Sequence, residues 1–329
     1  MNAQPDDTLR IHGFAALAPG PRLIVLGGVH GDETCGTAAI ERAVAEVDNG
    51  TLQLLRGQLT MVPVANPLAR RLRRREGERN LNRSFRPLPQ GEIPADYEGR
   101  ITDVLCPLLE RHDVLLDLHS FQSEGEAFGM IGPRDNAGPL EPFARAFEEG
   151  WLALHLGTSR VVEGWLDIYA AGLAQRAGGK PPDDAALAFG WGTNEYMRSR
   201  GGYGVTLECG QHEDPFAPEV AHRAIHAALR LLGMTASDPL ALPAAAPVLL
   251  RLVSVTDRFN DEDQLVREWA TFDTVARGEP IAVRSDGSLL RAERDGFIVF
   301  PNAIAKPGTE WFYFAVASDR DLARPAAER

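Results

Sequence analysis

The sequence has few cysteines, no long apolar run and no excess of positive charge, and each absence excludes a class of protein. Its three cysteines, Cys35, Cys106 and Cys209, are odd in number and widely spaced, which argues against a disulfide framework. No apolar run approaches the length of a membrane span. A formal net charge of −12 gives no general attraction to nucleic acid or to anionic membranes.

What is present is the composition of an ordinary globular protein. Hydrophobic residues make up 44% and charged residues 24% of the 329 positions, so we expect a packed core. The first ten residues are polar and acidic and lack the apolar core of a signal peptide, from which we expect a soluble, cytoplasmic protein. The length allows a catalytic domain followed by a smaller one.

The turn at residues 27–33, with the sequence GGVHGDE, offers the first candidates for chemistry. It follows the apolar run LIVL at 23–26, a predicted buried strand, and precedes residues 34–47, whose apolar positions recur at helical spacing. His30 and Glu33 therefore lie at the carboxyl end of a strand, where open α/β sheets place their ligands. Three positions apart on a tight turn, they can reach one metal ion.

A second histidine is needed, because zinc in hydrolases commonly takes two imidazoles and one carboxylate and leaves a fourth position for water. His119 ends the predicted strand at 114–119 and is the best candidate. Asp117 points to the same face of that strand and could support the site from behind. We do not expect ligands among the other histidines, which lie in helical or surface contexts: His12, His112, His155, His212, His222 and His226.

The remaining pattern alternates strands and helices. Further strands are expected at 59–64, 128–131 and 203–208, and helices at 101–109, 140–156 and 218–232, with Pro107 ending or kinking the first of these three. Between Gly157 and Gly202 the periodicity fails, and we expect an irregular lid or substrate loop.

Beyond residue 237 the pattern changes. Three prolines and four alanines between Ser237 and Pro247 indicate a linker. After it come only short β-like runs at 248–256, 271–276, 280–284, 296–301 and 311–317. We therefore expect two domains, a catalytic domain at 1–238 and a small β domain at 247–329.

Two further features suggest a substrate pocket. Residues 70–85, RRLRRREGERNLNRSF, lack the interleaved aromatics of a nucleic-acid patch, and the acidic net charge contradicts that interpretation. Arginines and an asparagine amide beside a metal would instead bind a substrate carboxylate and polarise a carbonyl. Glu208 ends the predicted strand at 203–208 and so repeats the position of His119.

The order of these motifs resembles the succinylglutamate desuccinylase/aspartoacylase family, which is related to the zinc carboxypeptidases. The matching blocks lie within residues 23–212 and read HGDE at 30–33, Asn66-Pro67, NLNRSF at 80–85, DLH at 117–119 and Leu207-Glu208. The resemblance implies an α/β fold, a zinc carboxypeptidase-like mixed sheet with helices on both faces, followed by a small β-rich C-terminal domain. It also implies one Zn²⁺ per chain.

The resemblance further implies roles for the matching residues. His30, Glu33 and His119 match the family's zinc ligands, and Glu208 matches the catalytic glutamate that activates a zinc-bound water. The expected reaction is hydrolysis of the amide bond of an N-acyl amino acid or similar small amide. Alternatives are a zinc carboxypeptidase acting on peptide-like substrates and a non-catalytic zinc-containing binding protein.

The predicted substrate contacts come from arginines and an asparagine. Arg75 matches the residue that polarises the scissile carbonyl, and Asn82 and Arg83 match the pair that holds the substrate's carboxylate. Arg198 resembles a further substrate-binding arginine, with Arg200 as the alternative match. We expect a small-molecule partner, no nucleic acid and no membrane, and leave open a homo-oligomer.

Two positions qualify this expectation. The family commonly has aspartate where this chain has Asn80, which removes a negative charge near the pocket and leaves the acyl and amino groups open. Tyr313 is a candidate for a substrate-capping tyrosine, although a buried core aromatic is the favoured interpretation.

Overall fold

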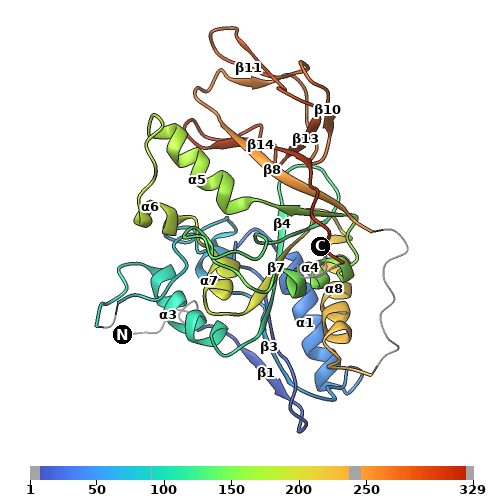
Figure 1. Ribbon diagram of the computed structural model, residues 1–329. Coiled ribbons are helices and arrows are strands. Elements are labelled where there is room, and N and C mark those ends of the chain that lie inside the picture. The colour runs from blue at the N-terminus through green and yellow to red at the C-terminus, as the bar shows by residue number, and fades with distance from the viewer. Residues whose placement is uncertain (1–7, 90, 237–245, 324–329) are drawn as a thin grey trace.

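The computed structural model describes residues 8–89, 91–236 and 246–323, and its centre is one large mixed sheet (Figure 1). Within the described residues this sheet has eleven strands in the order β1-β3-β2-β4-β7-β5-β6-β8-β14-β13-β10. From the N-terminal edge to β6 they are β1 (His12–Ala15), β3 (Gln58–Val62), β2 (Arg22–Leu26), β4 (Val114–Phe121), β7 (Tyr203–Gln211), β5 (Phe128–Met130) and β6 (Arg160–Glu163).

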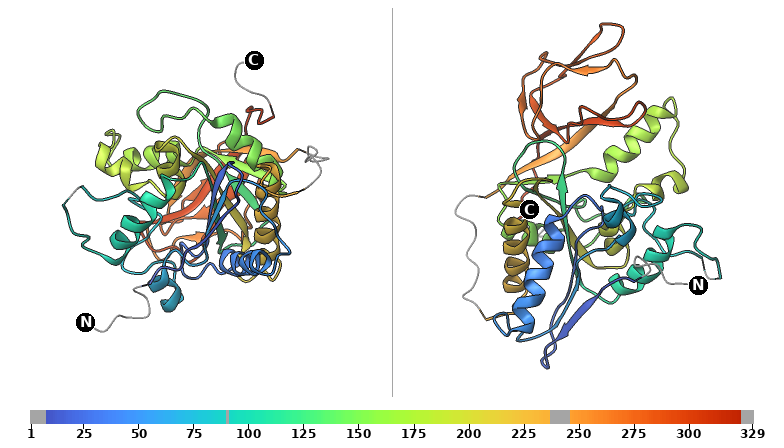
Figure 2. Two further views of the ribbon diagram at one scale, coloured as in Figure 1. Left: turned by 90° about the horizontal axis from the view of Figure 1, so that it is seen from below. Right: turned by 180° about the vertical axis from the view of Figure 1, so that it is seen from behind.

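Helices cover both faces of this sheet. They are α1 (Cys35–Asp48), α2 (Pro67–Leu72), α3 (Tyr97–Leu109), α4 (Ala146–His155), α5 (Trp165–Arg176), α6 (Asp184–Phe189), α7 (Thr193–Ser199) and α8 (Ala217–Leu231). Side chains of α1, α4 and α8 form one core with Leu23 and Val25 of β2, whereas side chains of α3 and α7 pack with Ile24 and Leu26. Alternate residues of this buried strand thus serve opposite cores, and Figure 2 shows the two helical layers. The predicted α/β class is confirmed.

The centre of the sheet determines where the functional side chains lie. Strands β2, β4 and β7 are neighbours and parallel, so their carboxyl ends meet at one edge. The turn after β2, the end of β4 and the end of β7 carry His30, His119 and Glu208, respectively. Residues separated by up to 178 positions in sequence are therefore brought together by strand pairing.

The C-terminal residues extend the same sheet. Strand β8 (Val248–Asp257) pairs with β6 in parallel, and β14 (Glu310–Ala317), β13 (Gly296–Val299) and β10 (Thr274–Val275) follow. A second, three-stranded sheet consists of β9 (Gln264–Leu265), β11 (Pro280–Val283) and β12 (Leu289–Arg291). We call residues 248–317 the C-terminal lobe, most of which lies at the top of Figure 1. The division into two domains stays a prediction, and most of the expected linker lies outside the described residues.

Four details of the expected secondary structure need correction. The span from Gly157 to Gly202 is not irregular, because it contains β6 and helices α5, α6 and α7. Residues 140–145 are not helical, since Phe143 instead forms an antiparallel bridge with Asn136. Residues 12–15, where no element was expected, form the short strand β1, and α3 starts at Tyr97 and continues two residues past Pro107. Within the described part of the chain, no helix has the length and apolarity needed to cross a membrane.

Candidate active site

The turn after β2 is held tightly against α2. Gly28 has a φ of 57°, a left-handed conformation that favours glycine. At Gly31 a Cβ atom would lie 2.0 Å from the backbone carbonyl carbon of Ala69 in α2, so no side chain fits there. The backbone N–H of Gly31 donates to the carbonyl oxygen of Arg74 at 3.1 Å. Glycines thus bring the turn, α2 and the arginine-rich loop into contact.

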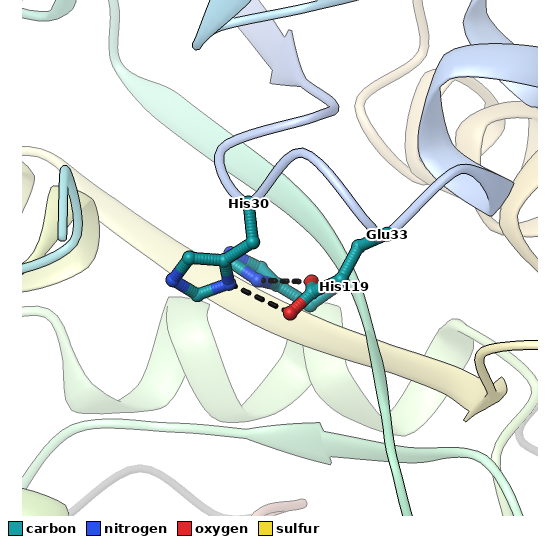
Figure 3. A group of neighbouring side chains, drawn as sticks. All are labelled: His30, Glu33 and His119. Atoms are coloured by element: carbon teal, nitrogen blue, oxygen red, sulfur yellow. Dashed lines mark hydrogen bonds and ion pairs between the residues drawn. The ribbon is translucent and has the colours of Figure 1, made fainter. Parts of the chain in front are cut away.

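His30, Glu33 and His119 converge at this turn (Figure 3). Nδ1 of His30 lies 2.7 Å from Oε1 of Glu33, and Nδ1 of His119 lies 2.8 Å from Oε2. All three side chains are buried, and one potential ligand atom from each lies within 4.8 Å of the others. Two imidazoles and a carboxylate form a donor set that suits a divalent transition metal.

The far nitrogens of both imidazoles face oxygen atoms. Nε2 of His30 donates to Oδ1 of Asn80 at 3.1 Å. Nε2 of His119 lies 3.0 Å from Oδ2 of Asp117, close enough for an ion pair but without hydrogen-bond geometry, and the hydroxyl of Thr193 donates to the same Asp117 oxygen. Metal-binding histidines typically have such a partner on the outer nitrogen, which fixes the ring and leaves the inner nitrogen for the ion.

The charges of this group are mutually dependent. Burial, followed by the charge of Arg75, lowers the pKa of His30 to about 4, so its imidazole is neutral at neutral pH. Burial alone would raise the pKa of Glu33, but His30 and His119 hold it well below its usual value. Burial would lower the pKa of His119, but Asp117 and Glu33 raise it well above the usual value. Because metals bind a neutral imidazole and an ionised carboxylate, His30 and Glu33 are already in the metal-binding form, whereas His119 would release its proton when an ion binds.

Unpartnered polar atoms gather around the same point. In the described residues, seven buried side-chain oxygen or nitrogen atoms lack a hydrogen-bond partner. Two of them belong to Asp32 and Glu208, which line the cavity, and two more are Oδ1 of Asp117 and the outer Nε2 of His119 behind it. Buried polar groups are normally satisfied, so such a concentration indicates a place for a bound ion or water. The residues present therefore fit a metal.

Glu208 stands beside this group on the neighbouring strand. The register of β4 and β7 pairs it directly with His119, and its side chain is buried. Burial raises the pKa of Glu208 well above its usual value and Glu33 adds to the effect, while His119 and Arg75 oppose it. The carboxyl therefore tends to hold a proton until a further positive charge arrives.

The arginine-rich loop forms the next wall. Arg75 donates to Oε1 of Glu33 at 3.2 Å, and its half-exposed side chain reaches into a cavity of about 1540 Å³. Asn82 accepts from the backbone N–H of Thr193 at 3.0 Å. Arg83 lies with its guanidinium carbon 5.2 Å from the centre of the Trp165 ring. All three line the cavity, together with His30, Glu33, His119 and Glu208.

Arg198 is placed differently from the other predicted substrate contacts. Its guanidinium is buried among three carboxylates, Glu149 at 2.9 Å, Glu141 at 2.7 Å and Glu195 at 3.3 Å. It lines the edge of the cavity, but these partners tie it to the protein. Arg200, the alternative, pairs with Glu110 at 3.0 Å and is half exposed. Contact of either arginine with substrate stays a prediction.

The C-terminal lobe contributes to the cavity as well. Tyr313 of β14 is buried, lines the cavity and packs against Trp165 with ring centres 5.6 Å apart. Glu310 and Lys306 lie on the same wall. Tyr313 is thus both a packed aromatic and a cavity residue.

Sequence reasoning missed three supporting residues. Glu98 at the start of α3 is fully buried and accepts from the backbone N–H groups of Gly77, Glu78 and Arg79 at 3.0, 3.3 and 3.1 Å. Thr193, noted above, supports Asp117. His212, whose Nδ1 lies 2.9 Å from the hydroxyl of Ser120, lines the cavity. Only His212 had a signal, since it directly follows the strand that carries Glu208.

Part of the chain matches the sequences of known proteins. The family model of the succinylglutamate desuccinylase/aspartoacylase catalytic domain matches residues 19–142. N-alpha-acetyl-L-2,4-diaminobutyric acid deacetylase of Halomonas elongata is 36% identical over 104 residues, which are 31% of this chain and 29% of that protein. The chain thus matches less than a third of the length of this curated relative.

Solved structures extend the likeness to the whole fold. The product-bound ectoine utilization protein EutE (DoeB) of Ruegeria pomeroyi has a TM-score of 0.69 at 20% identity, covering 93% of this chain and 88% of that one. A succinylglutamate desuccinylase/aspartoacylase of Rhodobacter sphaeroides also has a TM-score of 0.69, at 18% identity, covering 95% and 90%. The resemblance seen in the motifs is thus confirmed: residues 19–142 match the catalytic-domain model of the succinylglutamate desuccinylase/aspartoacylase family, and the solved structures share the fold.

Proposed function

We propose that this chain is a zinc-dependent amidohydrolase that removes the acyl group from an N-acyl amino acid or a similar small amide. The observation that carries the proposal is the convergence of His30, Glu33 and His119 beside Glu208 at the wall of one cavity. The protein family whose model matches residues 19–142 and the deacetylase relative support the same reaction.

His30, Glu33 and His119 would hold the ion. Zinc bound there would act as a Lewis acid on the acyl carbonyl and make a water more acidic. Asn80 and Asp117 would keep the two imidazoles oriented, since each faces an outer ring nitrogen.

Glu208 would move the proton. Its carboxylate would take a proton from the attacking water as the new carbon–oxygen bond forms at the acyl carbon. It would then give that proton to the amine nitrogen as the carbon–nitrogen bond breaks, so that a carboxylate and a free amine result. The unpartnered Oε2 of Glu208 is available for this transfer.

Arg75 and its neighbours would position the substrate. The guanidinium of Arg75 would donate to the oxygen that becomes negative in the transition state, a contribution worth roughly 10²–10³ in rate in comparable sites. Arg83 and the amide of Asn82 would hold a carboxylate of the substrate, and both line the cavity.

The experiment is a measurement of amine release by zinc-loaded protein across N-acyl amino acids and short peptides, with Glu208→Gln in parallel. Hydrolysis of one acyl amino acid class that disappears in the variant would support the proposal. Stepwise shortening of peptides without deacylation would replace it with a carboxypeptidase. Zinc binding without either activity would leave a binding protein.

A further inference from the structure

A second group of potential metal ligands lies where α1 and α8 pack side by side, a pairing visible in both figures of the fold (Figures 1 and 2). Glu46 lies near the end of α1, and His222 and His226 are four residues apart on α8, so they project from one helix face. Nε2 of His222 lies 2.9 Å from Oε1 of Glu46, and Nε2 of His226 lies 2.7 Å from Oε2. One potential ligand atom from each residue lies within 4.8 Å of the others.

The geometry suits a small divalent ion. Zinc–nitrogen bonds of about 2.0–2.1 Å in a tetrahedral site place neighbouring ligand atoms roughly 3.3 Å apart. That spacing lies between the 2.7 and 2.9 Å nitrogen–oxygen distances of this group and the 4.8 Å within which its three ligand atoms fall. His222 is buried, whereas the side chain of His226 is 34% exposed, which leaves one side of the group open to an entering ion and to water.

The chemical state of these residues also fits. Burial lowers the pKa of His222, so its imidazole is neutral at neutral pH. Burial would raise the pKa of Glu46, but hydrogen bonds from His226 and His222 lower it, so the carboxylate is ionised. Arg42 lies 3.4 Å from Glu46, yet its exposed guanidinium is held at 2.7 Å by Glu219 and can stay with that partner.

The buried His112 and His155 differ in their surroundings. Nδ1 of His112 and Nδ1 of His155 each bond to a backbone carbonyl oxygen four residues earlier, Leu108 and Trp151 respectively. His112 also bonds to the hydroxyl of Thr60. Those contacts are typical of structural histidines, whereas His222 and His226 both turn Nε2 toward one carboxylate.

We propose that Glu46, His222 and His226 bind one divalent first-row transition metal ion, best matched by Zn²⁺, in a structural site that links α1 to α8. Two imidazoles and a carboxylate are the donors that this class of ion prefers. Glu46 lies about 16 Å along α1 from Cys35, so the site is separate from the one at His30. The link would join the helix that follows the His30 turn to the helix that follows β7.

The test is the number of zinc ions bound per chain, measured by equilibrium dialysis at pH 7. The proteins are wild type, His226→Gln, Glu46→Gln and the matched control His12→Gln, which alters a histidine of β1 outside both groups. We expect both cluster variants to bind one zinc fewer than wild type, or to bind it at least about tenfold more weakly, since even indirect partners of a ligand are worth 10–100-fold in affinity. The control should match wild type.

Unchanged stoichiometry and affinity in both cluster variants would overturn the proposal. Because the result is a difference from wild type, it does not depend on whether the site at His30 holds zinc. Should neither variant fold, the His30→Ala protein decides: one zinc per chain supports the second site, and none overturns it. In the supporting case, zinc should also raise the Tm of wild type more than that of His226→Gln.

Discussion

His119 and Glu208 occupy directly paired positions on the adjacent parallel strands β4 and β7, and both line the same cavity. The sheet, rather than a loop, therefore fixes the proposed proton acceptor beside the proposed ligand. Burial raises the pKa of Glu208, and a cation at His119 would lower it again. In the proposed mechanism the ion and the base are thus coupled, because the base becomes ionised when the ion is bound.

Replacement of Glu208 by Gln should abolish proton transfer while keeping the shape of the site. We expect kcat to fall by about 10²–10⁴, the usual worth of a positioned acid–base group. Zinc content should stay at the wild-type value, because the predicted ligands are untouched. Steady-state amine release and metal analysis on one preparation check both points. Near-full activity would remove Glu208 from the mechanism.

Replacement of His30 by Ala should remove metal as well as activity. His30 supplies one of three converging ligand atoms, and its loss leaves a two-ligand site. We expect zinc at this site to fall below detection after dialysis and activity to be lost with it. Chelation of wild type should have the same effect, reversed by added zinc. A variant that keeps the wild-type zinc content would contradict the ligand assignment.

Substitutions of Asn80 test whether the hydrogen bond to the outer nitrogen of His30 strengthens metal binding. Its Oδ1 accepts from Nε2 of His30 and also from the backbone N–H of Asn82 at 2.9 Å. Asn80→Ala should weaken metal binding by about 10–100-fold, as loss of such outer partners does. Asn80→Asp keeps both acceptor contacts and adds a negative charge, so it should bind zinc more tightly than wild type. Competition with a coloured chelator measures the order, and equal affinities in all three proteins would refute it.

Glu98→Gln should disturb the arginine-rich loop without touching the cavity. One oxygen of Glu98 accepts from Asn66 and Gly77, and the other accepts from Glu78 and Arg79. A glutamine must therefore aim its NH₂ group at two donors in either orientation.

We expect this change to lower the free energy of unfolding by about 1–3 kcal/mol, the cost of unsatisfied buried groups. It should also raise KM, since Arg75 and Asn82 lie on the displaced loop. Denaturant unfolding and kinetics measure the two effects. Glu92→Gln, an exposed change of the same charge, is the control and should leave both unchanged.

Asp263 should make the stability of the C-terminal lobe depend on pH. Its buried carboxylate accepts from the backbone of Phe259, Asn260 and Ser285 and from Arg284. Burial would raise the pKa of Asp263, but these donors lower it far below the usual value. Stability from this group is therefore fully present above the unfolded pKa of about 3.9 and is lost as pH falls further.

Asp263→Asn should accordingly cost about 1–3 kcal/mol of unfolding free energy at pH 7, the usual cost of leaving buried donors unsatisfied. The difference from wild type should shrink as the pH is lowered below about 4. Urea unfolding at pH 7 and pH 3.5 checks this. A difference that is constant with pH would show that the carboxylate charge is not responsible.

Sequence patterns predicted the buried strands well, because runs such as LIVL at 23–26 serve two cores and are apolar throughout. They failed for α5 and α6, because α5 buries only Leu166, Ile168 and Gly172, and α6 has no buried residue. Helices lying on a cavity rim carry no regular apolar stripe, so periodicity does not reveal them.

The candidate site shows the same division. His30, Glu33, His119 and Glu208 were found because strand ends concentrate polar residues at one edge of a sheet, and the structure brings these four together. The ion pairs that surround Arg198 were not predictable, since Glu141 and Glu149 reach it from a segment 49–57 positions away. The catalytic and substrate-binding roles of the predicted site residues stay predictions.

The pairing of β8 with β6 has a consequence for how the molecule unfolds. Loss of the C-terminal lobe would leave β6 as an unpaired edge with the buried side chains of Val161 and Val162 beside it. If the C-terminal lobe unfolded by itself, the backbone hydrogen-bonding groups between β6 and β8 would be exposed. Heat or denaturant should therefore unfold the whole sheet in one cooperative transition. Tyr313, which lines the cavity from the C-terminal lobe, should lose its place in the same transition as His30 and the strands that carry the site.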